Sequence, residues 1–174
     1  MIKENIQEAI NDQINAELYS SYIYLSMAAY FGNEGLDGFE NWMHAQSIEE
    51  INHTMRLYNF LESRGGRVRL KEIEKPKEDW ESPLDAFKDV YEHEQYVTDR
   101  INELADLAEK ENDRATLQML QWFIEEQVEE EESAEEILDK LEMVGEEGSG
   151  LMMLDNELGT RPIGSVFPVE PAQE

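Results

Sequence analysis

Proline and glycine divide this chain into four long segments, and no other feature of the sequence constrains its fold as strongly. The segments have similar lengths, and Pro interrupts none of them; they cover residues 3–31, 37–64, 83–111 and 113–144. Glu, Leu, Ala and Gln are frequent in them, and segments of this length and composition are typical of helices rather than strands. With a rise of about 1.5 Å per residue, each helix would be roughly 40 Å long.

The connections between these segments indicate how the helices are arranged. Short connections follow the first and third helices, so each of these helices is expected to lie antiparallel to the next. The stretch at 65–82 is long enough to cross the whole length of a bundle. The sequence therefore predicts an all-α four-helix bundle with one long crossover between helices two and three.

The crossover holds an unusual share of the chain's scarce positive charge. Its basic residues are Arg67, Arg69, Lys71, Lys75 and Lys77. A solvated loop or a subunit contact is the favoured interpretation of this stretch, and a phosphate site is the less favoured one.

A short fifth helix is expected after the bundle, at residues 149–160. Ser149 is a candidate N-cap, and Leu151, Leu154 and Leu158 share one face of the helix. A helix of this length is not stable alone, so it must pack against the bundle. The spacing of the last three Pro residues predicts an irregular tail at 161–174.

Composition narrows the classes of partner. The chain has 41 acidic and 14 basic residues, a formal net charge of −27 and no cysteine. The lack of cysteine excludes disulfide scaffolds, zinc ribbons and thiol catalysis, and most of the surface would repel a polyanion such as nucleic acid. Cations are favoured as a class of partner, although the acidity is equally consistent with a role in solubility or with a salty cytoplasm.

The sequence shows no signal for a membrane or for export. No apolar run approaches the roughly 18 residues of a membrane span, and the first residues lack the apolar stretch of a signal peptide. We expect a cytoplasmic protein with no membrane partner and no nucleic-acid partner.

Polar residues interrupt the middle of the apolar stripe on each predicted helix. Residues taken at alternating spacings of three and four form stripes whose ends are mostly apolar. The middles of these stripes carry Glu17, Glu50, His53, Glu94, Gln127 and Glu130. Because the midpoints of the helices in a four-helix bundle lie at similar depth, we expect these side chains to meet in one place.

Four carboxylates that meet inside a bundle need compensating charge. A buried, unpaired carboxylate is strongly unfavourable even after relaxation, and no Lys or Arg occupies the central stripes. Two divalent metal ions would balance the four negative charges. Carboxylates with one imidazole suit iron or manganese, and zinc can also bind. Glu50 and His53 lie one helical turn apart on the same face, and the whole pattern predicts a dinuclear metal centre.

An ordinary bundle with buried polar contacts is the alternative interpretation. Taken alone, Glu50-x-x-His53 is more often a surface pair than a pair of ligands, and the Glu-rich stretch at 125–136 would normally be a solvated face. The metal centre is favoured because polar interruptions occur near the midpoint of four separate apolar stripes.

Several longer motifs carry a resemblance to a known family. The first two segments contain Asn-Ala-Glu17-Leu-Tyr-Ser-Ser-Tyr22-Ile-Tyr24, Gly-Phe39-Glu-Asn-Trp42-Met and Glu49-Glu50-Ile-Asn-His53. The rest of the chain contributes Trp-Glu-Ser-Pro83-Leu, Tyr91-Glu-His-Glu94 and Trp122-Phe-Ile-Glu-Glu126-Gln127-Val-Glu129-Glu130-Glu. With these motifs, the chain resembles the non-haem ferritins of bacteria and archaea along nearly all of residues 1–160.

The resemblance implies a ferritin-like domain at 1–160, with the bundle at 3–144, and a hollow homo-oligomeric cage of twenty-four subunits. It also implies iron storage and detoxification by a ferroxidase. In that activity, O₂ or H₂O₂ oxidises two Fe²⁺ ions at a di-iron centre within each subunit, and the Fe³⁺ is deposited as a mineral inside the cage.

The same resemblance implies roles for individual residues. The first iron would be held by Glu17, Glu50 and His53, with Glu50 bridging to the second. The second iron would be held by Glu94 and Glu130, near Gln127. A third iron site would be formed by Glu49, Glu126 and Glu129 together with Glu130. Tyr24 is the candidate catalytic residue, as an electron donor or as a hydrogen-bond partner of a ligand.

Departures from related families also bear on the cofactor. Position 52 is Asn, where haem-binding relatives would carry a Met ligand, so we expect no haem. The fourth helix has Gln127-x-x-Glu130 and no second His, which points away from bacterioferritins and di-iron oxygenases. Without cysteine there is no rubredoxin-like module, which argues against a rubrerythrin.

Two other functions are compatible with the sequence. One is a small di-iron oxidase or peroxidase with the same fold that stores no iron. The other is a structural or adaptor bundle that binds no metal at all.

Overall fold

Five α-helices account for most of the described part of the chain. The computed structural model describes residues 2–145 and 148–165, and no strand occurs within those ranges. The helices are α1 (Glu4–Glu34), α2 (Asp37–Ser63), α3 (Pro83–Lys110), α4 (Arg114–Val144) and α5 (Gly148–Leu158). The predicted four long helices, long crossover and short fifth helix are confirmed.

Local sequence signals fix several helix ends. Ser82 caps α3 and Asp113 caps α4, because each side chain accepts a hydrogen bond of 3.1 Å from the backbone N–H three residues further on. Gly35 terminates α1 with a left-handed φ of 73°. The helix therefore runs past residue 31, where we expected it to end, as far as the first glycine that adopts this conformation.

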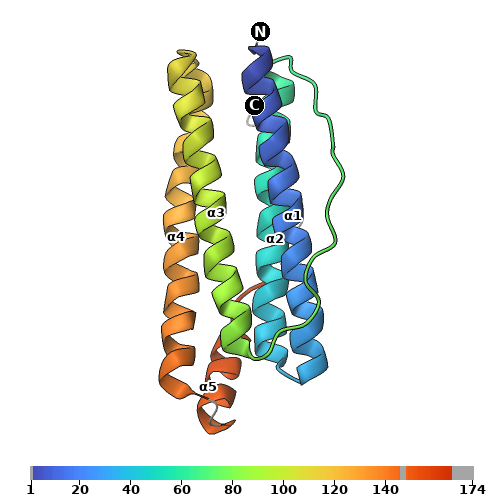
Figure 1. Ribbon diagram of the computed structural model, residues 1–174, viewed down its shortest axis with the longest axis vertical. Coiled ribbons are helices and arrows are strands. Elements are labelled where there is room, and N and C mark those ends of the chain that lie inside the picture. The colour runs from blue at the N-terminus through green and yellow to red at the C-terminus, as the bar shows by residue number, and fades with distance from the viewer. Residues whose placement is uncertain (1, 146–147, 166–174) are drawn as a thin grey trace, which may run out of the picture.

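The helices form two antiparallel pairs, α1 with α2 and α3 with α4 (Figure 1). The crossover between α2 and α3 runs along α1 from one end of the bundle to the other (Figure 1). Side chains of α1 hold its backbone through hydrogen bonds of 2.6–2.8 Å, at Gln7, Asn11 and Ser26. The crossover is therefore held against the surface of α1 by hydrogen bonds along its length.

Lysines of the crossover are engaged within the chain. The ion pairs join Lys71 to Asp12, Lys75 to Glu78, and Lys77 to both Asp85 and Asp89. These pairs fit the interpretation of a solvated loop better than that of a phosphate site, because the cations already have carboxylate partners.

The core consists of two apolar clusters, one toward each end of the bundle. The cluster at the α5 end is rich in aromatic rings and includes Tyr24, Phe31, Phe39, Trp42 and Phe87. The other cluster is mostly aliphatic and includes Ile6, Ile10, Ile14, Leu57, Leu61 and Leu120. Burial of apolar side chains at both ends fixes the helices relative to one another, and this positions the polar residues that lie between the clusters.

The short helix α5 docks against the start of α2. The Asp155 carboxylate accepts hydrogen bonds from the backbone N–H groups of Gly38 and Phe39, at 2.8 and 3.1 Å. These bonds satisfy two donors in the first turn of α2 that have no partner within their own helix. Leu154 and Leu158 are buried against the bundle, as the shared face predicts.

The bounds of α5 differ slightly from the expectation. The helix already includes Ser149, so this residue is not its N-cap. It ends at Leu158, before the expected residue 160, because Thr160 and Arg161 bond to carbonyl groups three residues back, which tightens the turn. Residues 166–174 of the expected tail lie outside the described residues.

Among the residues that the structure describes, no helix has both the length and the apolar character needed to cross a membrane.

Gly38 is predicted to be essential for docking of α5. An added Cβ would lie 1.7 Å from the backbone oxygen of Asp155, so Gly38→Ala should displace α5 and destabilise the subunit by about 1–3 kcal/mol. Thermal unfolding measures this loss, and limited proteolysis between α4 and α5 detects the displaced helix. Gly148→Ala is the matched control, because its Cβ would meet nothing within 4 Å. Equal thermal midpoints for both variants would contradict the prediction.

Candidate metal centre

The polar layer between the two apolar clusters receives side chains from all four long helices. The six polar residues of the central stripes are all buried, with exposed fractions of 1–8%. α1 supplies Glu17, α2 supplies Glu50 and His53, α3 supplies Glu94, and α4 supplies Gln127 and Glu130. The alternating three-and-four spacing turns each of these residues toward the bundle axis.

Glu17, Glu50 and His53 form the first group of potential ligands. One ligand atom from each lies within 4.8 Å of the other two, and His53 Nδ1 is 3.5 Å from Glu50 Oε2. Glu17 Oε2 and Glu50 Oε2 are buried and have no hydrogen-bond partner. Two orphaned carboxylate oxygens beside an imidazole fit a metal ion, which would satisfy all three groups at once.

Glu94 and Glu130 lie across the bundle and are held by neutral donors. The Tyr24 hydroxyl donates to Glu94 Oε1, and Gln127 Nε2 donates to Glu94 Oε2 at 3.3 Å. Gln46 Nε2 donates to Glu130 Oε2 at 2.7 Å. These donors orient the carboxylates and leave their negative charge available to a cation.

The third predicted set is only partly assembled. Glu126 and Glu130 form a second group of potential ligands, but the third member of that group is His53. The structure places Glu49 and Glu129 in neither of the two groups. Glu129 is exposed on α4, and the Glu49 carboxylate is paired with Arg161.

Electrostatics of the layer follow from burial and from the mutual proximity of the acids. Burial, followed by the Glu50 charge, raises the pKa of Glu17 to about 8. Burial, followed by the Glu94 charge, raises the pKa of Glu130 to about 7. The pKa values of Glu50 and Glu94 are raised mainly by burial as well. The metal-free site therefore holds protons near neutral pH.

Sequence reasoning did not single out two glutamines that support these ligands. Gln13 Nε2 donates to Glu17 Oε1 at 2.8 Å, and Gln46 contacts Glu130 as described above. Arg100 Nε in turn donates to Gln13 Oε1 at 3.1 Å, which fixes the direction in which the amide points. Each glutamine lies one turn before a ligand on the same stripe, and that spacing is the signal that could have identified it.

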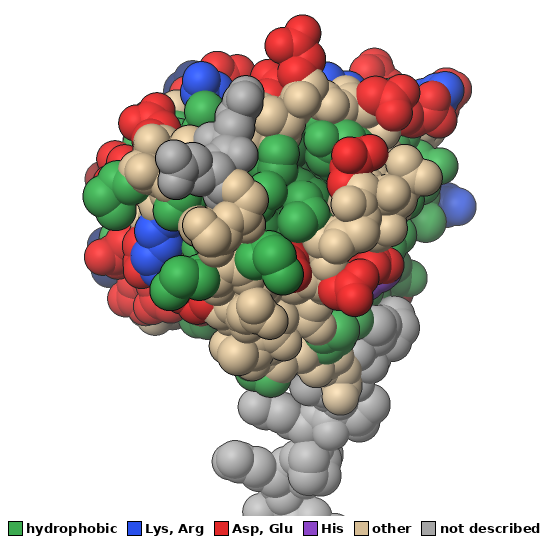
Figure 2. Space-filling model, turned by 90° about the horizontal axis from the view of Figure 1, so that it is seen from below, with side chains coloured by type: hydrophobic (Ala, Val, Ile, Leu, Met, Phe, Trp, Pro, Cys, Tyr) green, Lys and Arg blue, Asp and Glu red, His purple; other side chains and the backbone are tan. Residues whose placement is uncertain are grey.

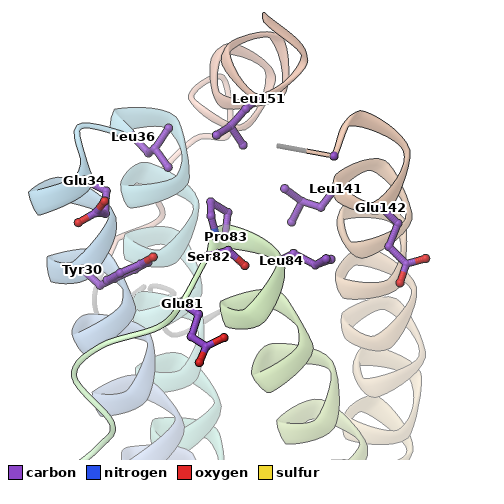
Figure 3. Close-up of a pocket in the computed structure, with 11 residues that line it drawn as sticks. Tyr30, Glu34, Leu36, Glu81, Ser82, Pro83, Leu84, Leu141, Glu142 and Leu151 are labelled. Atoms are coloured by element: carbon purple, nitrogen blue, oxygen red, sulfur yellow. The ribbon is translucent and has the colours of Figure 1, made fainter. Parts of the chain in front are cut away.

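The bundle also has an open cavity of about 410 Å³, but it lies away from these residues. It is found at the α5 end, where Leu36, Pro83, Leu84, Leu141 and Leu151 point into it (Figure 3). Viewed from that end, apolar side chains lie at the centre of the surface, where it is hollowed, and acidic side chains surround them (Figure 2). None of the predicted metal ligands lines this cavity.

Fold and site together define a class of protein. An antiparallel four-helix bundle with carboxylates from every helix and an imidazole at its centre has the arrangement that ferritin-like di-iron carboxylate proteins use. A family model described as a ferritin-like domain matches residues 7–144. This chain belongs to the ferritin-like family, and the resemblance seen in its motifs is confirmed.

Individual relatives agree with this assignment. A bacterial non-heme ferritin of Bacteroides fragilis is 42% identical over 161 residues, which cover 92% of this chain and 100% of the relative. One from Staphylococcus aureus is 38% identical and covers 92% of this chain and 97% of the relative. The crystal structure of an open pore ferritin from the hyperthermophilic archaeon Archaeoglobus fulgidus is similar at 52% identity and a TM-score of 0.92, covering 93% of this chain and 100% of that one.

The raised pKa of Glu17 predicts how the stability of the metal-free protein depends on pH. The folded protein keeps a proton on Glu17 up to about pH 8, whereas an unfolded Glu loses it near 4.5. The stabilisation that comes from this retained proton is complete below pH 4.5, and it is lost as pH rises through about 8. Within that window, each retained proton lowers the free energy of unfolding by about 1.4 kcal/mol per pH unit.

Thermal midpoints of the metal-free protein between pH 5.5 and 8.5 measure this effect. Glu17→Gln keeps the shape of the side chain but not its titration, so its midpoint should fall less steeply with pH than that of the wild type. Parallel curves for the two proteins would show that Glu17 does not carry the proton.

Proposed function

We propose that this protein is a ferritin that stores and detoxifies iron, and that the buried centre of each subunit is its ferroxidase site. Fe²⁺ is the substrate, Fe³⁺ deposited as a mineral is the product, and O₂ or H₂O₂ accepts the electrons. The observation that carries the proposal is the pair of orphaned oxygens on Glu17 and Glu50 beside His53. The family and its named ferritin relatives support the same function.

The donor sets assign two substrate ions to different sides of the layer. Glu17, Glu50 and His53 would bind one Fe²⁺, and Glu94 with Glu130 would bind the other. Glu50 would be the bridging ligand, as the family resemblance implies. Burial is the main cause of its raised pKa, and the Glu94 and Glu130 charges from the side of the second ion raise it further. The side with the imidazole should bind Fe²⁺ more tightly than the side with carboxylates alone.

Protons accompany the binding of iron at this centre. Because burial raises the pKa of Glu17 and Glu130, these carboxyl groups are partly protonated at neutral pH before metal binds. Fe²⁺ must displace those protons, so its binding releases acid and strengthens as pH rises. Tyr24 and Gln127 hold Glu94 in place during the exchange.

Oxidation then removes one electron from each Fe²⁺ ion. With H₂O₂ as oxidant, the electrons of two Fe²⁺ ions reduce one peroxide molecule to water, with protons from solvent. Holding both ions in a single buried site supplies the two electrons together. Glu126 and Glu130, with Glu49 and Glu129 on the adjoining face, would form a third site through which iron leaves toward the mineral.

Storage further requires a closed particle, which we propose to be a homo-oligomeric cage of twenty-four subunits. The α5 end of the bundle fits a subunit contact, because Met143, Met152 and Met153 are 66–80% exposed there. Apolar surface of this kind marks an association surface. The same end carries the apolar hollow seen in Figure 2.

Glu50→Ala should slow rapid Fe²⁺ oxidation by at least about tenfold, because it removes the bridging ligand. The assembled particle should persist, since loss of one of several buried like charges does not destabilise the metal-free bundle. Stopped-flow absorbance after mixing Fe²⁺ with O₂ measures the rate. Glu62→Ala is the control, as it removes one exposed acid from the same helix, and equal rates for both variants would reject the site.

Particle mass and iron content separate storage from the alternative functions. A cage of twenty-four chains of 20.3 kDa should have a mass near half a megadalton. After loading with Fe²⁺ in air, it should retain many more iron atoms per subunit than its sites can bind. A small oligomer that oxidises Fe²⁺ without retaining it would indicate a di-iron oxidase, and a particle without iron would indicate a structural bundle.

A further inference from the structure

A return segment, residues 159–165, leads from α5 back along α2 (Figure 1). Two asparagines of α2 hold its backbone: Asn41 Nδ2 donates to Arg161 O at 2.9 Å, and Asn52 Nδ2 donates to Ser165 O at 3.3 Å. These two asparagines lie three turns apart on α2. The return segment therefore follows the face of α2 that includes Glu49, next to the candidate metal centre.

Arg161 is the one residue of the return segment that forms an ion pair in the described chain. Its Nη2 lies 2.5 Å from Glu49 Oε2, and its Cζ lies 4.7 Å from the centroid of the Trp42 ring. The carboxylate and the aromatic face hold the guanidinium from two sides. Only about a quarter of the Arg161 side chain is exposed, 24%, so its charge is partly shielded from solvent and salt.

Glu49 is electrostatically part of the third set of acids. Partial burial raises the pKa of Glu126, His53 lowers it, and the Glu129 and Glu49 charges raise it further. Glu49 also raises the pKa of Glu130. Nevertheless, the ligand atoms that lie within 4.8 Å of one another belong to His53, Glu126 and Glu130, and the Glu49 carboxylate is engaged with Arg161 instead.

We propose that Arg161 is a built-in cation of the third site, which holds the Glu49 carboxylate and competes with a divalent metal ion for it. A metal ion that recruits Glu49 must first break its pair with Arg161. The third site consequently binds Fe²⁺ more weakly than its acidic residues alone would, and it releases iron readily. This inference rests on the proposed function, because it concerns how one of the iron sites fills and empties.

An anaerobic titration of the assembled protein with Fe²⁺, measured by isothermal titration calorimetry, tests the proposal. The wild type should show two strong sites per subunit and a weaker third one. Arg161→Gln keeps much of the side-chain shape but removes the charge, so it should strengthen the third site by about two- to fivefold. Arg161→Lys keeps the charge and should restore an affinity close to that of the wild type.

Two further variants separate competition from a general effect of charge or of chain anchoring. Lys140 of α4 forms an ion pair with Glu157 of α5. Lys140→Gln therefore removes one positive charge from a contact that does not involve Glu49, and it should leave the affinity of the third site unchanged. In a Glu49→Gln background, Arg161→Gln should no longer strengthen the third site, because the contested carboxylate is gone.

The possible results are decisive in both directions. Equal third-site affinities in wild type and Arg161→Gln, or equal gains in Arg161→Gln and Lys140→Gln, would overturn the role of Arg161 while leaving the two strong sites and the proposed function intact. If neither the wild type nor any variant shows two strong Fe²⁺ sites per subunit, the proposed function and this inference both fail.

Discussion

Four buried carboxylates that share one space without Lys or Arg are the constraint on which this structure depends. The apolar clusters on either side hold the helices and keep four acids largely away from solvent, with exposed fractions of 1–8%: Glu17, Glu50, Glu94 and Glu130. Among the described ion pairs, none joins these acids to Lys or Arg. Burial is the main cause of their raised pKa values, and the neighbouring carboxylate charges add to it, so in the absence of metal these acids take up protons. A cation in the site relieves the repulsion between them more completely.

Neutral hydrogen-bond donors are the means by which the chain orders these acids without cancelling their charge. Gln13 donates to Glu17, Gln46 to Glu130, and Tyr24 with Gln127 to Glu94. An amide or a phenol restricts where a carboxylate points but carries no positive charge of its own. At the edge of the layer the chain uses the opposite device, since Arg161 neutralises Glu49 directly.

Much of this arrangement was readable from the sequence, and the errors have local causes. Helix spacing placed Glu17, Glu50, His53, Glu94, Gln127 and Glu130 in one layer because every residue of a stripe faces the same neighbour. The first helix extends beyond the predicted end at residue 31, because the sequence offers several glycines and only folding shows that Gly35 takes the left-handed conformation. Ser149 has the residue type of an N-cap, but α5 already includes it, so the prediction of a cap there is wrong.

The sequence by itself determined the helices, their antiparallel order and the polar layer, because these follow from periodicity within each helix and from the lengths of the connections. Only the tertiary structure decided which donor meets which carboxylate, how closely α5 approaches Gly38, and that Arg161 reaches Glu49. Except for Gln13 with Glu17, which are four positions apart, those contacts join residues about 30 to more than 100 positions apart in the chain. Their geometry depends on how the helices pack against one another, which no periodicity within a single segment records.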